Sequence, residues 1–281
     1  MKGYLYTRAQ KEDGEAIEYE MFREVAEKLN IEFDRIAFRE CLLNEDGLFC
    51  NGSPVVPADF VIYRFDDGQI GNELISRCNL CVNDRKAVNL WKNKSFQLRT
   101  LNISGIRKPK YIISAKNVKY ENLSSVLGEK FEIKKPEGAG GKDVSLVKNA
   151  EEFKRALGHY QANEELIFQE YIKNSFGRDL RIYCFKDEKV LAYTRKNKKD
   201  FRSNVMQGGT MSKADVLPLY ENIAKQVYTQ TNLLFFTVDL LYDDDSFVFC
   251  EINTSPGFEH EEVAETLFNL IELELTNNIR R

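Results

Sequence analysis

Apolar residues near the C-terminus fall into two short runs that three consecutive acidic residues separate. The runs are Leu233–Tyr242 and Phe247–Ile252, and Asp243–Asp245 lies between them. Short apolar runs rich in β-branched and aromatic residues, joined by a polar turn, are typical of paired strands. The pattern therefore predicts a β-hairpin over this part of the chain.

Three polar residues of this hairpin can supply oxygen ligands. Asp239 lies inside the first run, whereas Glu251 and Asn253 lie two apart at the end of the second and so point to one face. Hard oxygen ligands that converge from two strands suit Mg²⁺. Asp239 can face Glu251 only if the turn has an odd number of residues or if a bulge interrupts the pairing. The alternative is that all three are ordinary polar residues of an edge strand.

The first 82 residues alternate short apolar runs with amphipathic stretches. The expected strands are Gly3–Tyr6, Ile31–Phe38, Phe60–Tyr63 and Leu80–Val82, the expected helices are Glu15–Leu29 and Gly71–Arg77, and Asn51-Gly52 is the expected hairpin turn. This alternation predicts a small, largely parallel α/β sheet. No G-x-G-x-x-G follows the first strand, so a dinucleotide-binding role has little support.

The middle of the chain combines a predicted helix with a glycine-rich hairpin. The helix is expected over Asn83–Leu101, with Asn83 or Asp84 as its cap, and it carries Lys94. Two strands are expected within Phe131–Val147, on either side of Gly138-Ala139-Gly140-Gly141-Lys142. The glycines let backbone N–H groups approach an anion, and Lys134 ends the incoming strand. Because a strand follows the glycines, the segment is not a Walker P-loop, and a plain hairpin turn is the alternative.

The remaining segments are predicted to be three helices and three strands. The helices are Ala150–Tyr160, Lys213–Gln230 and Glu261–Leu275, and the strands are Leu166–Ile172, Asp179–Phe185 and Val190–Arg195. Asp179 and Arg181 share one face of their strand. The basic segment 195–199, followed by Arg202-Ser203-Asn204, is either a solvated loop or a set of donors for phosphate oxygens.

Composition narrows the class of protein. The chain has 281 residues, of which 43% are hydrophobic and 30% charged, with no apolar run of membrane-spanning length and no signal-peptide pattern. We therefore expect a cytoplasmic protein without a membrane partner. The net charge of −4 argues against a nucleic-acid partner.

Histidine and cysteine chemistry has little support. The chain has only two histidines, which makes a histidine-based nucleophile improbable. Among its six cysteines only Cys78 and Cys81 have the spacing of metal ligands, and a second such pair is missing. A redox protein that uses these two thiols is still an alternative, and it requires a low thiol pKa.

The order of these parts resembles the ATP-grasp ligases and, within them, the RimK-like amino-acid and peptide ligases. The resemblance rests on FQEYIKNSFGRDLRIY, FRSN and CEINTSPGFE and covers most of residues 83–281. It implies an α/β fold that is α+β within the grasp. The implied domains are a pre-ATP-grasp α/β domain at 1–82, a lid subdomain with its linking helix at 83–168, and a C-terminal ATP-grasp subdomain at 169–281.

The resemblance also implies two ligands, ATP and magnesium, the latter usually as a pair of ions that Mn²⁺ can replace. ATP would be bound by Lys94, Lys134, Gly138, Gly140, Gly141, Gln169, Glu170, Tyr171, Ile172 and Asp179. The metal would be held by Asp239, Glu251 and Asn253, and the catalytic residues would be Arg181, Arg202 and Asn204.

The implied reaction joins a carboxylate to an amine through an acyl phosphate, with ADP and phosphate as the other products. The substrate would be an amino acid, a peptide or a protein tail, and a homo-oligomer is compatible with the family. The chain departs from the family pattern at Gln207, where an arginine is usual, and at His260, where a glycine is usual. The alternative function is an ATP-binding module without catalytic activity.

Overall fold

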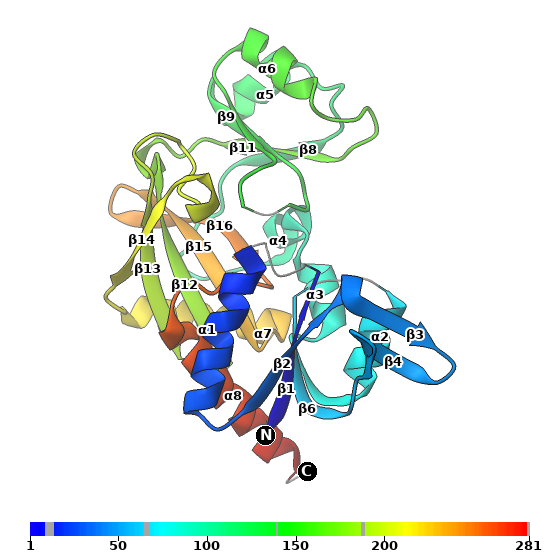
Figure 1. The fold of residues 1–281 in the computed structure, drawn as a ribbon. Helices are drawn as coiled ribbons and strands as arrows, with labels where there is room; N and C mark the ends of the chain where they lie inside the picture. Colours follow the sequence, from blue (N-terminus) through cyan, green and yellow to red (C-terminus); the bar gives the residue numbers. More distant parts are fainter. Residues whose placement is uncertain (9–13, 65–67, 139, 187–188, 280–281) are drawn as a thin grey trace.

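The fold consists of three sheet-based parts, which Figure 1 shows as an upper lobe, a lower module on one side and a larger sheet on the other. The computed structural model describes residues 1–8, 14–64, 68–138, 140–186 and 189–279. Ala139, which belongs to the predicted glycine-rich loop, lies outside the described residues.

The N-terminal module contains a parallel sheet with the strand order β2-β1-β6-β7. Its strands are β1 (Lys2–Thr7), β2 (Glu32–Ala37), β6 (Ala58–Tyr63) and β7 (Cys78–Val82), and its helices are α1 (Gly14–Lys28) and α2 (Gln69–Ser76). The predicted parallel α/β sheet is confirmed. It forms because each strand is a short apolar run that helices cover on its faces.

A smaller antiparallel sheet projects from this module, to the right in Figure 1. It contains β3 (Cys41–Asn44), β4 (Gly47–Cys50) and β5 (Ser53–Pro54), and the 3₁₀ turn η1 (Phe38–Glu40) leads into it. Asn51 and Gly52 form the predicted turn, with φ angles of +51° and +77°. Strand β3 is not among the predicted elements.

The predicted single helix over Asn83–Leu101 is wrong, because the chain forms two short helices there. They are α3 (Arg85–Trp91) and α4 (Lys94–Thr100). The Asp84 carboxylate accepts a hydrogen bond from Ala87 N at 2.9 Å, and the Asn93 side chain accepts one from Phe96 N at 2.9 Å. Because Asn93 caps a new first turn, the second helix starts at Lys94.

The upper lobe is an antiparallel sheet with the order β10-β9-β11-β8, covered by two helices. The elements are β8 (Tyr111–Ser114), α5 (Tyr120–Leu127), β9 (Phe131–Lys134), β10 (Val144–Val147), α6 (Ala150–Leu157) and β11 (Leu166–Glu170). The two predicted strands around the glycine-rich segment are confirmed. Helix α5 is not among the predicted elements, and its Leu123 and Leu127 are buried in the core of the lobe.

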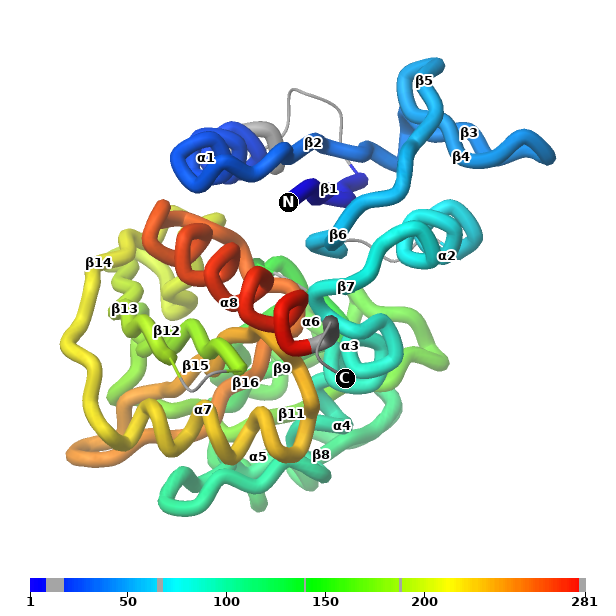
Figure 2. The backbone as a smooth tube through the Cα atoms, turned by 90° about the horizontal axis from the view of Figure 1, so that it is seen from below, coloured from blue at the N-terminus to red at the C-terminus, as the bar shows by residue number. Residues whose placement is uncertain are grey.

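The third part is a five-stranded antiparallel sheet with the order β14-β13-β12-β15-β16. Its strands are β12 (Arg178–Phe185), β13 (Val190–Lys196), β14 (Thr210–Ala214), β15 (Phe235–Asp243) and β16 (Ser246–Asn253), and the 3₁₀ turns η2 (Lys173–Ser175) and η3 (Val205–Gln207) lie beside them. Helix α7 (Pro218–Thr231) packs on one face, and α8 (Glu261–Ile279) lies between this sheet and the N-terminal module (Figure 2).

The prediction that a helix begins at Lys213 is wrong. Lys213 and Ala214 belong to β14 and pair with β13, and the helix starts at Pro218. Proline suits this first turn because its missing N–H would have no partner within the helix. Val216, inside the predicted helix, lies before α7 and is 40% exposed.

Two buried amides connect the parts around the third sheet. Asn83 donates to Thr254 O at 2.9 Å and accepts from Phe235 N at 2.9 Å. Gln97 accepts from Ile252 N at 2.8 Å and donates to Ile252 O at 2.9 Å. Since these amides satisfy buried backbone groups, Gln97 fixes α4 against β16, and Asn83 fixes the segment before α3 against the start of β15 and the residue after β16.

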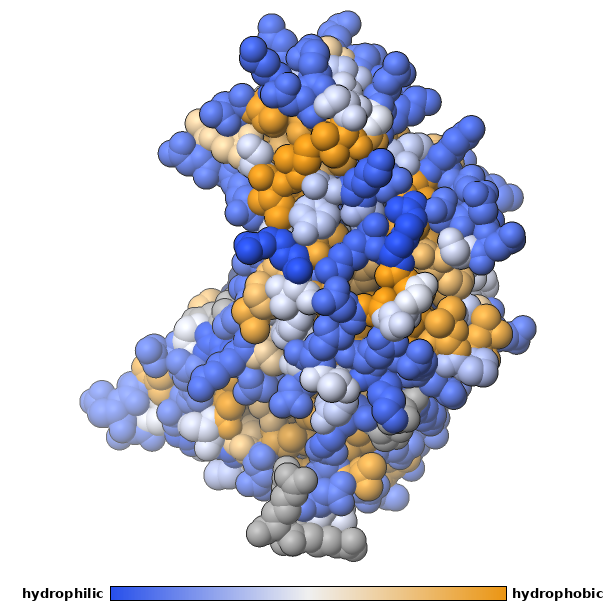
Figure 3. All heavy atoms as spheres, turned by 180° about the vertical axis from the view of Figure 1, so that it is seen from behind, coloured by the Kyte–Doolittle hydropathy of each residue, from blue (hydrophilic) through white to orange (hydrophobic). Residues whose placement is uncertain are grey.

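The face seen in Figure 3 is largely hydrophilic, with several apolar patches. Seen from behind, a concave notch separates the upper lobe from the N-terminal module (Figure 3). Among the described helices, none has the length and apolar character that crossing a bilayer requires.

Candidate active site

The hairpin of β15 and β16 places Asp239 directly opposite Glu251. Its turn has two residues between the paired Asp243 and Ser246, an even number, so regular pairing would leave these two carboxylates on opposite faces. The register shifts after Asp239, where Leu240 pairs with the second residue before Glu251, and this β-bulge restores the shared face. Of the two conditions stated in the sequence analysis, an odd-numbered turn or a β-bulge, the structure therefore meets the β-bulge.

Asp239 is buried between two arginines. Its Oδ1 and Oδ2 accept bonds of 2.9 and 2.8 Å from Nε and Nη2 of Arg181, and Oδ2 also accepts a 2.7 Å bond from Arg195 Nη2. Only 1% of Asp239 is exposed. Burial alone would raise the pKa of Asp239, but the two guanidinium groups outweigh it and lower the pKa to about 2. The side chain is therefore a carboxylate at neutral pH.

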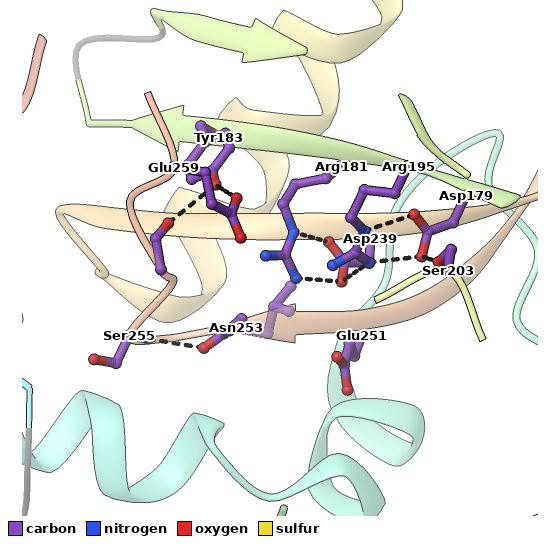
Figure 4. Close-up of polar contacts among 12 residues, drawn as sticks. Asp179, Arg181, Tyr183, Arg195, Ser203, Asp239, Glu251, Asn253, Ser255 and Glu259 are labelled. Carbon is purple, nitrogen blue, oxygen red and sulfur yellow. Dashed lines mark hydrogen bonds and ion pairs between the residues drawn. The ribbon is translucent and has the colours of Figure 1, made fainter. Parts of the chain in front are cut away.

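The same ion pairs continue to the loop that follows β13. Arg195 Nε and Nη2 donate to the Asp179 carboxylate at 2.8 and 2.6 Å, and Ser203 Oγ donates to Asp179 Oδ2 at 2.6 Å (Figure 4). Arg195 is 3% exposed, so the solvated-loop interpretation of segment 195–199 does not hold for it. The predicted hairpin could have indicated this ion pair, because Arg195 lies directly opposite Asp179 across β12 and β13.

Glu251 and Asn253 lie on the same side of β16 (Figure 4). Glu251 Oε2 lies 3.3 Å from Lys94 Nζ, and Asn253 Oδ1 accepts a 3.0 Å bond from Ser255 N. Among the described residues, groups of three or more His, Cys, Asp or Glu that could hold a metal are absent. Two carboxylates and one amide oxygen nevertheless fit magnesium, which binds few protein ligands when phosphates and water complete its octahedron.

The described residues of the glycine-rich segment lie against three side chains that can bind anions or carbonyls. Lys94 Nζ donates to Gly138 O at 2.7 Å, Arg202 Nη1 to Gly141 O at 2.7 Å, and Gln207 Nε2 to Gly140 O at 3.0 Å. Gly140 and Gly141 have φ angles of +67° and +71°. Glycine is required here for a second reason, since a Cβ atom at Gly141 would lie 2.8 Å from the Asn204 side chain.

Lys134 lies at the end of β9, inside the cleft. Its ammonium group is buried and lies 2.7 Å from the carboxylate of Glu132, two residues earlier on the same face. Burial would lower the pKa of Lys134, but the Glu132 carboxylate outweighs it and raises the pKa. Lys134 is therefore a fixed positive charge.

These residues enclose a cleft with about 810 Å³ of space that protein atoms do not fill, open solvent at its mouth included. The predicted residues that line it are Lys94, Lys134, Gly138, Gly140, Gly141, Tyr171, Ile172, Asp179, Arg202, Asn204, Asp239 and Glu251. Arg195 and Ser203, which the sequence analysis named as possible phosphate donors, also line it. Lining residues that the sequence analysis did not select are Glu132, Lys135, Asp143, Val144, Ser175, Arg178, Phe201, Leu241 and Cys250.

Four predicted site residues do not line this cleft: Arg181, Gln169, Glu170 and Asn253. The Glu170 carboxylate accepts bonds of 3.1 Å from Arg107 Nη1 and 2.9 Å from Lys110 N, at the junction between the lobe and the third sheet. Gln169 is 1% exposed, and its Nε2 has no hydrogen-bond partner among the described residues.

The thiol alternative finds no support in the environment of its two cysteines. Burial raises the pKa of Cys78 to about 11 and that of Cys81 to about 12. Both thiols are therefore protonated at neutral pH, whereas a redox nucleophile needs a thiolate.

The fold and the cleft together define an ATP-grasp protein. An antiparallel lid sheet faces a second antiparallel sheet, and lysines, a glycine-rich segment and an acidic hairpin lie between them. The family model described as "RimK-like ATP-grasp domain" matches residues 91–273. The chain therefore belongs to the RimK-like ATP-grasp family.

Three proteins illustrate what this chain is similar to. A probable alpha-L-glutamate ligase of Citrobacter koseri is 30% identical over 184 residues, which is 64% of this chain and 61% of the relative. A ribosomal protein bS6–L-glutamate ligase of Shigella boydii is 29% identical over 181 residues, 63% of this chain and 60% of the relative. The chain thus matches about three fifths of the length of these relatives.

The third is a solved structure. The ATP-grasp ligase PsnB, complexed with a phosphomimetic variant of a minimal precursor, Mg and ADP, superposes with a TM-score of 0.67 and 15% identity. The superposition covers 98% of this chain and 99% of that one. It shows that the fold extends over the N-terminal module as well as the grasp.

Proposed function

We propose that this chain is an ATP-dependent carboxylate–amine ligase that forms an amide bond through an acyl phosphate. The observation that carries the proposal is the bulged hairpin, which sets Asp239 opposite Glu251 beside Lys94 at the cleft. Phosphoryl transfer depends mainly on alignment and on compensation of charge, which these groups can provide without a histidine.

Cationic side chains would bind the nucleotide phosphates. Lys134 is a buried cation, while Lys94 and Arg202 now bind carbonyl oxygens of the glycine-rich segment. Phosphate oxygens can replace those carbonyls, because they accept the same hydrogen bonds and carry more negative charge. Tyr171 and Ile172, which directly follow β11, would lie along the base.

Asp239, Glu251 and Asn253 would hold magnesium at the phosphates. When bound, the metal neutralises charge on the oxygens of the transferred phosphoryl group. Asp239 is suited to this role because its two arginines keep it ionised and fix its orientation. Three points stay predictions from the sequence. They are a pair of metal ions, Mn²⁺ as a substitute for magnesium, and a cytoplasmic location.

The reaction would have two steps. A carboxylate oxygen of the first substrate attacks the γ-phosphorus of ATP, the bond to the β,γ-bridging oxygen breaks, and ADP leaves. An amine nitrogen then attacks the acyl carbon, inorganic phosphate leaves with the bonding electrons, and the amine loses a proton. Arg202 and Asn204 line the cleft and would contact the transferred group, with the glycine-rich segment limiting access of water.

We propose an amino acid as one substrate and an amino acid, peptide or protein tail as the other. The names of the two relatives support this class, since one includes glutamate and the other also a ribosomal protein. The division into domains at 1–82, 83–168 and 169–281 belongs to the same proposal. Its lid subdomain includes α3 and α4, although these helices pack on the core of the third sheet.

The test is release of ADP from Mg·ATP during a screen of amino acids in pairs and with peptides. The expected result is ADP release that depends on both substrates, together with an amide product detected by mass spectrometry. Glu251→Gln should abolish it and Cys78→Ser should not. Nucleotide binding without ADP release for any pair would favour the ATP-binding module without activity.

A further inference from the structure

Two cysteines lie directly opposite each other in the small sheet that projects from the N-terminal module. Cys41 is the first residue of β3 and Cys50 the last of β4, and the register pairs them. The next pair along the ladder, Glu40 and Asn51, is hydrogen-bonded, because Asn51 N donates to Glu40 O at 3.0 Å. Hydrogen-bonded and non-hydrogen-bonded pairs alternate along an antiparallel ladder, so Cys41 and Cys50 form a non-hydrogen-bonded pair.

This type of pair has the geometry that a disulfide needs. Its Cα atoms lie about 4.5 Å apart and its side chains share one face of the sheet, whereas disulfides span about 4.4–6.8 Å between Cα atoms. Both cysteines are free thiols. Cys50 is 9% exposed and belongs to the core of the module, while Cys41 is half-buried at the edge of that core. The register therefore places the two cysteines within the range of Cα separations that a disulfide spans.

The C-x-x-C pair that the sequence makes conspicuous lacks this geometry. Cys78 and Cys81 lie three residues apart on one strand, β7, so their side chains point to opposite faces. Cys184 is fully buried in the third sheet, and burial raises its pKa. These cysteines serve as internal comparisons for the pair on β3 and β4.

We propose that Cys41 and Cys50 are a reversible modification site, at which a small disulfide such as glutathione disulfide converts the two thiols into a disulfide across β3 and β4. One thiolate attacks a sulfur of glutathione disulfide and releases one glutathione. The second cysteine, after losing its proton, attacks the mixed disulfide and releases the other. Two protein thiols are oxidised and one glutathione disulfide is reduced to two glutathiones.

The electrostatic surroundings favour this exchange. The Cys41 thiol stabilises a thiolate at Cys50 and lowers the pKa of Cys50 to about 7, while the same contact raises the pKa of Cys41. Thiol–disulfide exchange needs a thiolate as the attacking group, and it is fastest for a thiol whose pKa lies near the ambient pH. The pair therefore carries a nucleophile near neutral pH, which Cys78 and Cys81 do not.

This site is separate from the ATP cleft. Strands β3 and β4 lie on the far side of the N-terminal module from β15 and β16 in both views of the chain (Figures 1 and 2). The inference does not depend on the ligase proposal, and oxidation should leave nucleotide binding unchanged.

The test is to equilibrate the folded full-length protein in glutathione buffers of decreasing reducing power and to measure its intact mass and its cross-linked peptides. Wild type should lose about 2 Da, the mass of two hydrogens, with one linked peptide pair that contains Cys41 and Cys50. Dithiothreitol should reverse the loss. Cys78→Ser is the matched control and should behave like wild type.

Cys41→Ser keeps a hydroxyl that can donate to Cys50 in place of the thiol, and it should accumulate a glutathione adduct at Cys50 instead of losing two hydrogens. Since Cys50 is the more buried of the two, Cys41→Ser should disturb folding less than Cys50→Ser, and its unfolding transition would be measured in parallel. Wild type that gains only glutathione adducts, that links a different pair of cysteines or that does not react would overturn the proposal.

Discussion

Arg181 binds Asp239 through two parallel hydrogen bonds, from Nε to Oδ1 at 2.9 Å and from Nη2 to Oδ2 at 2.8 Å. The two residues pair directly across β12 and β15. A forked arginine bond fixes both the position and the plane of a carboxylate. The residue proposed to bind magnesium is thus oriented by a partner that does not itself line the cleft.

This relationship predicts that substitutions of the two hairpin carboxylates, Asp239 and Glu251, change the free energy of unfolding by different amounts. Asp239→Asn leaves two buried guanidiniums without their shared counter-ion and should lower the free energy of unfolding by about 3–5 kcal/mol. Glu251→Gln breaks a partly exposed pair with Lys94 and should change it by less than about 1 kcal/mol. Urea titration followed by circular dichroism measures both. Equal stability losses would contradict this account of Asp239.

The same carboxylate predicts a pH dependence of stability. The pKa of Asp239 is about 2 in the folded protein against an ordinary value of 3.8, because Arg181 and Arg195 outweigh the effect of burial. A lowered pKa gives stability that is complete above about pH 4 and is lost as the pH falls to about 2, by roughly 2 kcal/mol. The stability difference between wild type and Asp239→Asn should shrink over this window. Parallel pH curves for the two proteins would argue against the pairing.

Arg195 offers a test of the ion pairs that connect β13 with β12 and β15. Its forked guanidinium binds both Asp179 and Asp239, and a lysine ammonium cannot reproduce that geometry. Arg195→Lys should lower the free energy of unfolding by about 2 kcal/mol, since bonds to charged groups contribute this much. The exposed neighbour Lys196 is the matched control, and Lys196→Ala should be neutral. Urea unfolding that cannot distinguish the two variants would count against a structural role for Arg195.

Gln207 should influence how long a nucleotide stays bound. Its side chain donates to Gly140 O at 3.0 Å and so ties the glycine-rich segment to the loop that carries Arg202. Losing one such bond, worth about 0.5–1.5 kcal/mol, should speed dissociation of a fluorescent ATP analogue by about 2- to 10-fold in Gln207→Ala. Gln161→Ala, on an exposed loop of the upper lobe, provides the control. Stopped-flow traces that coincide for both variants would remove this role of Gln207.

Much of the fold could be predicted because its signals are local. The apolar runs, the turn at Asn51-Gly52 and the alternation in the first 82 residues all depend on neighbours in sequence. The break between α3 and α4 could not be predicted in this way. Asn93 is compatible with the exposed face of a longer helix, and its capping role appears only when its side chain binds Phe96 N.

The site depends more on contacts between distant residues. The sequence predicted three oxygen ligands on the hairpin. The bulge that brings Asp239 opposite Glu251 is a property of the paired strands. Likewise, Gln97 looks like an ordinary helix residue, although it fixes α4 on β16 through Ile252 and so sets Lys94 beside Glu251. Such contacts follow from tertiary packing rather than from local pattern.

The most direct test of the central claim is calorimetric titration of Mg·ATP into wild type and into Glu251→Gln, because it requires no knowledge of the substrates. We expect wild type to bind and the variant, with its fold intact, to bind at least about 10-fold more weakly, a loss of about 1.4 kcal/mol. Absence of binding by folded wild type, or equal binding by both proteins, would contradict the placement of ATP and magnesium at this hairpin.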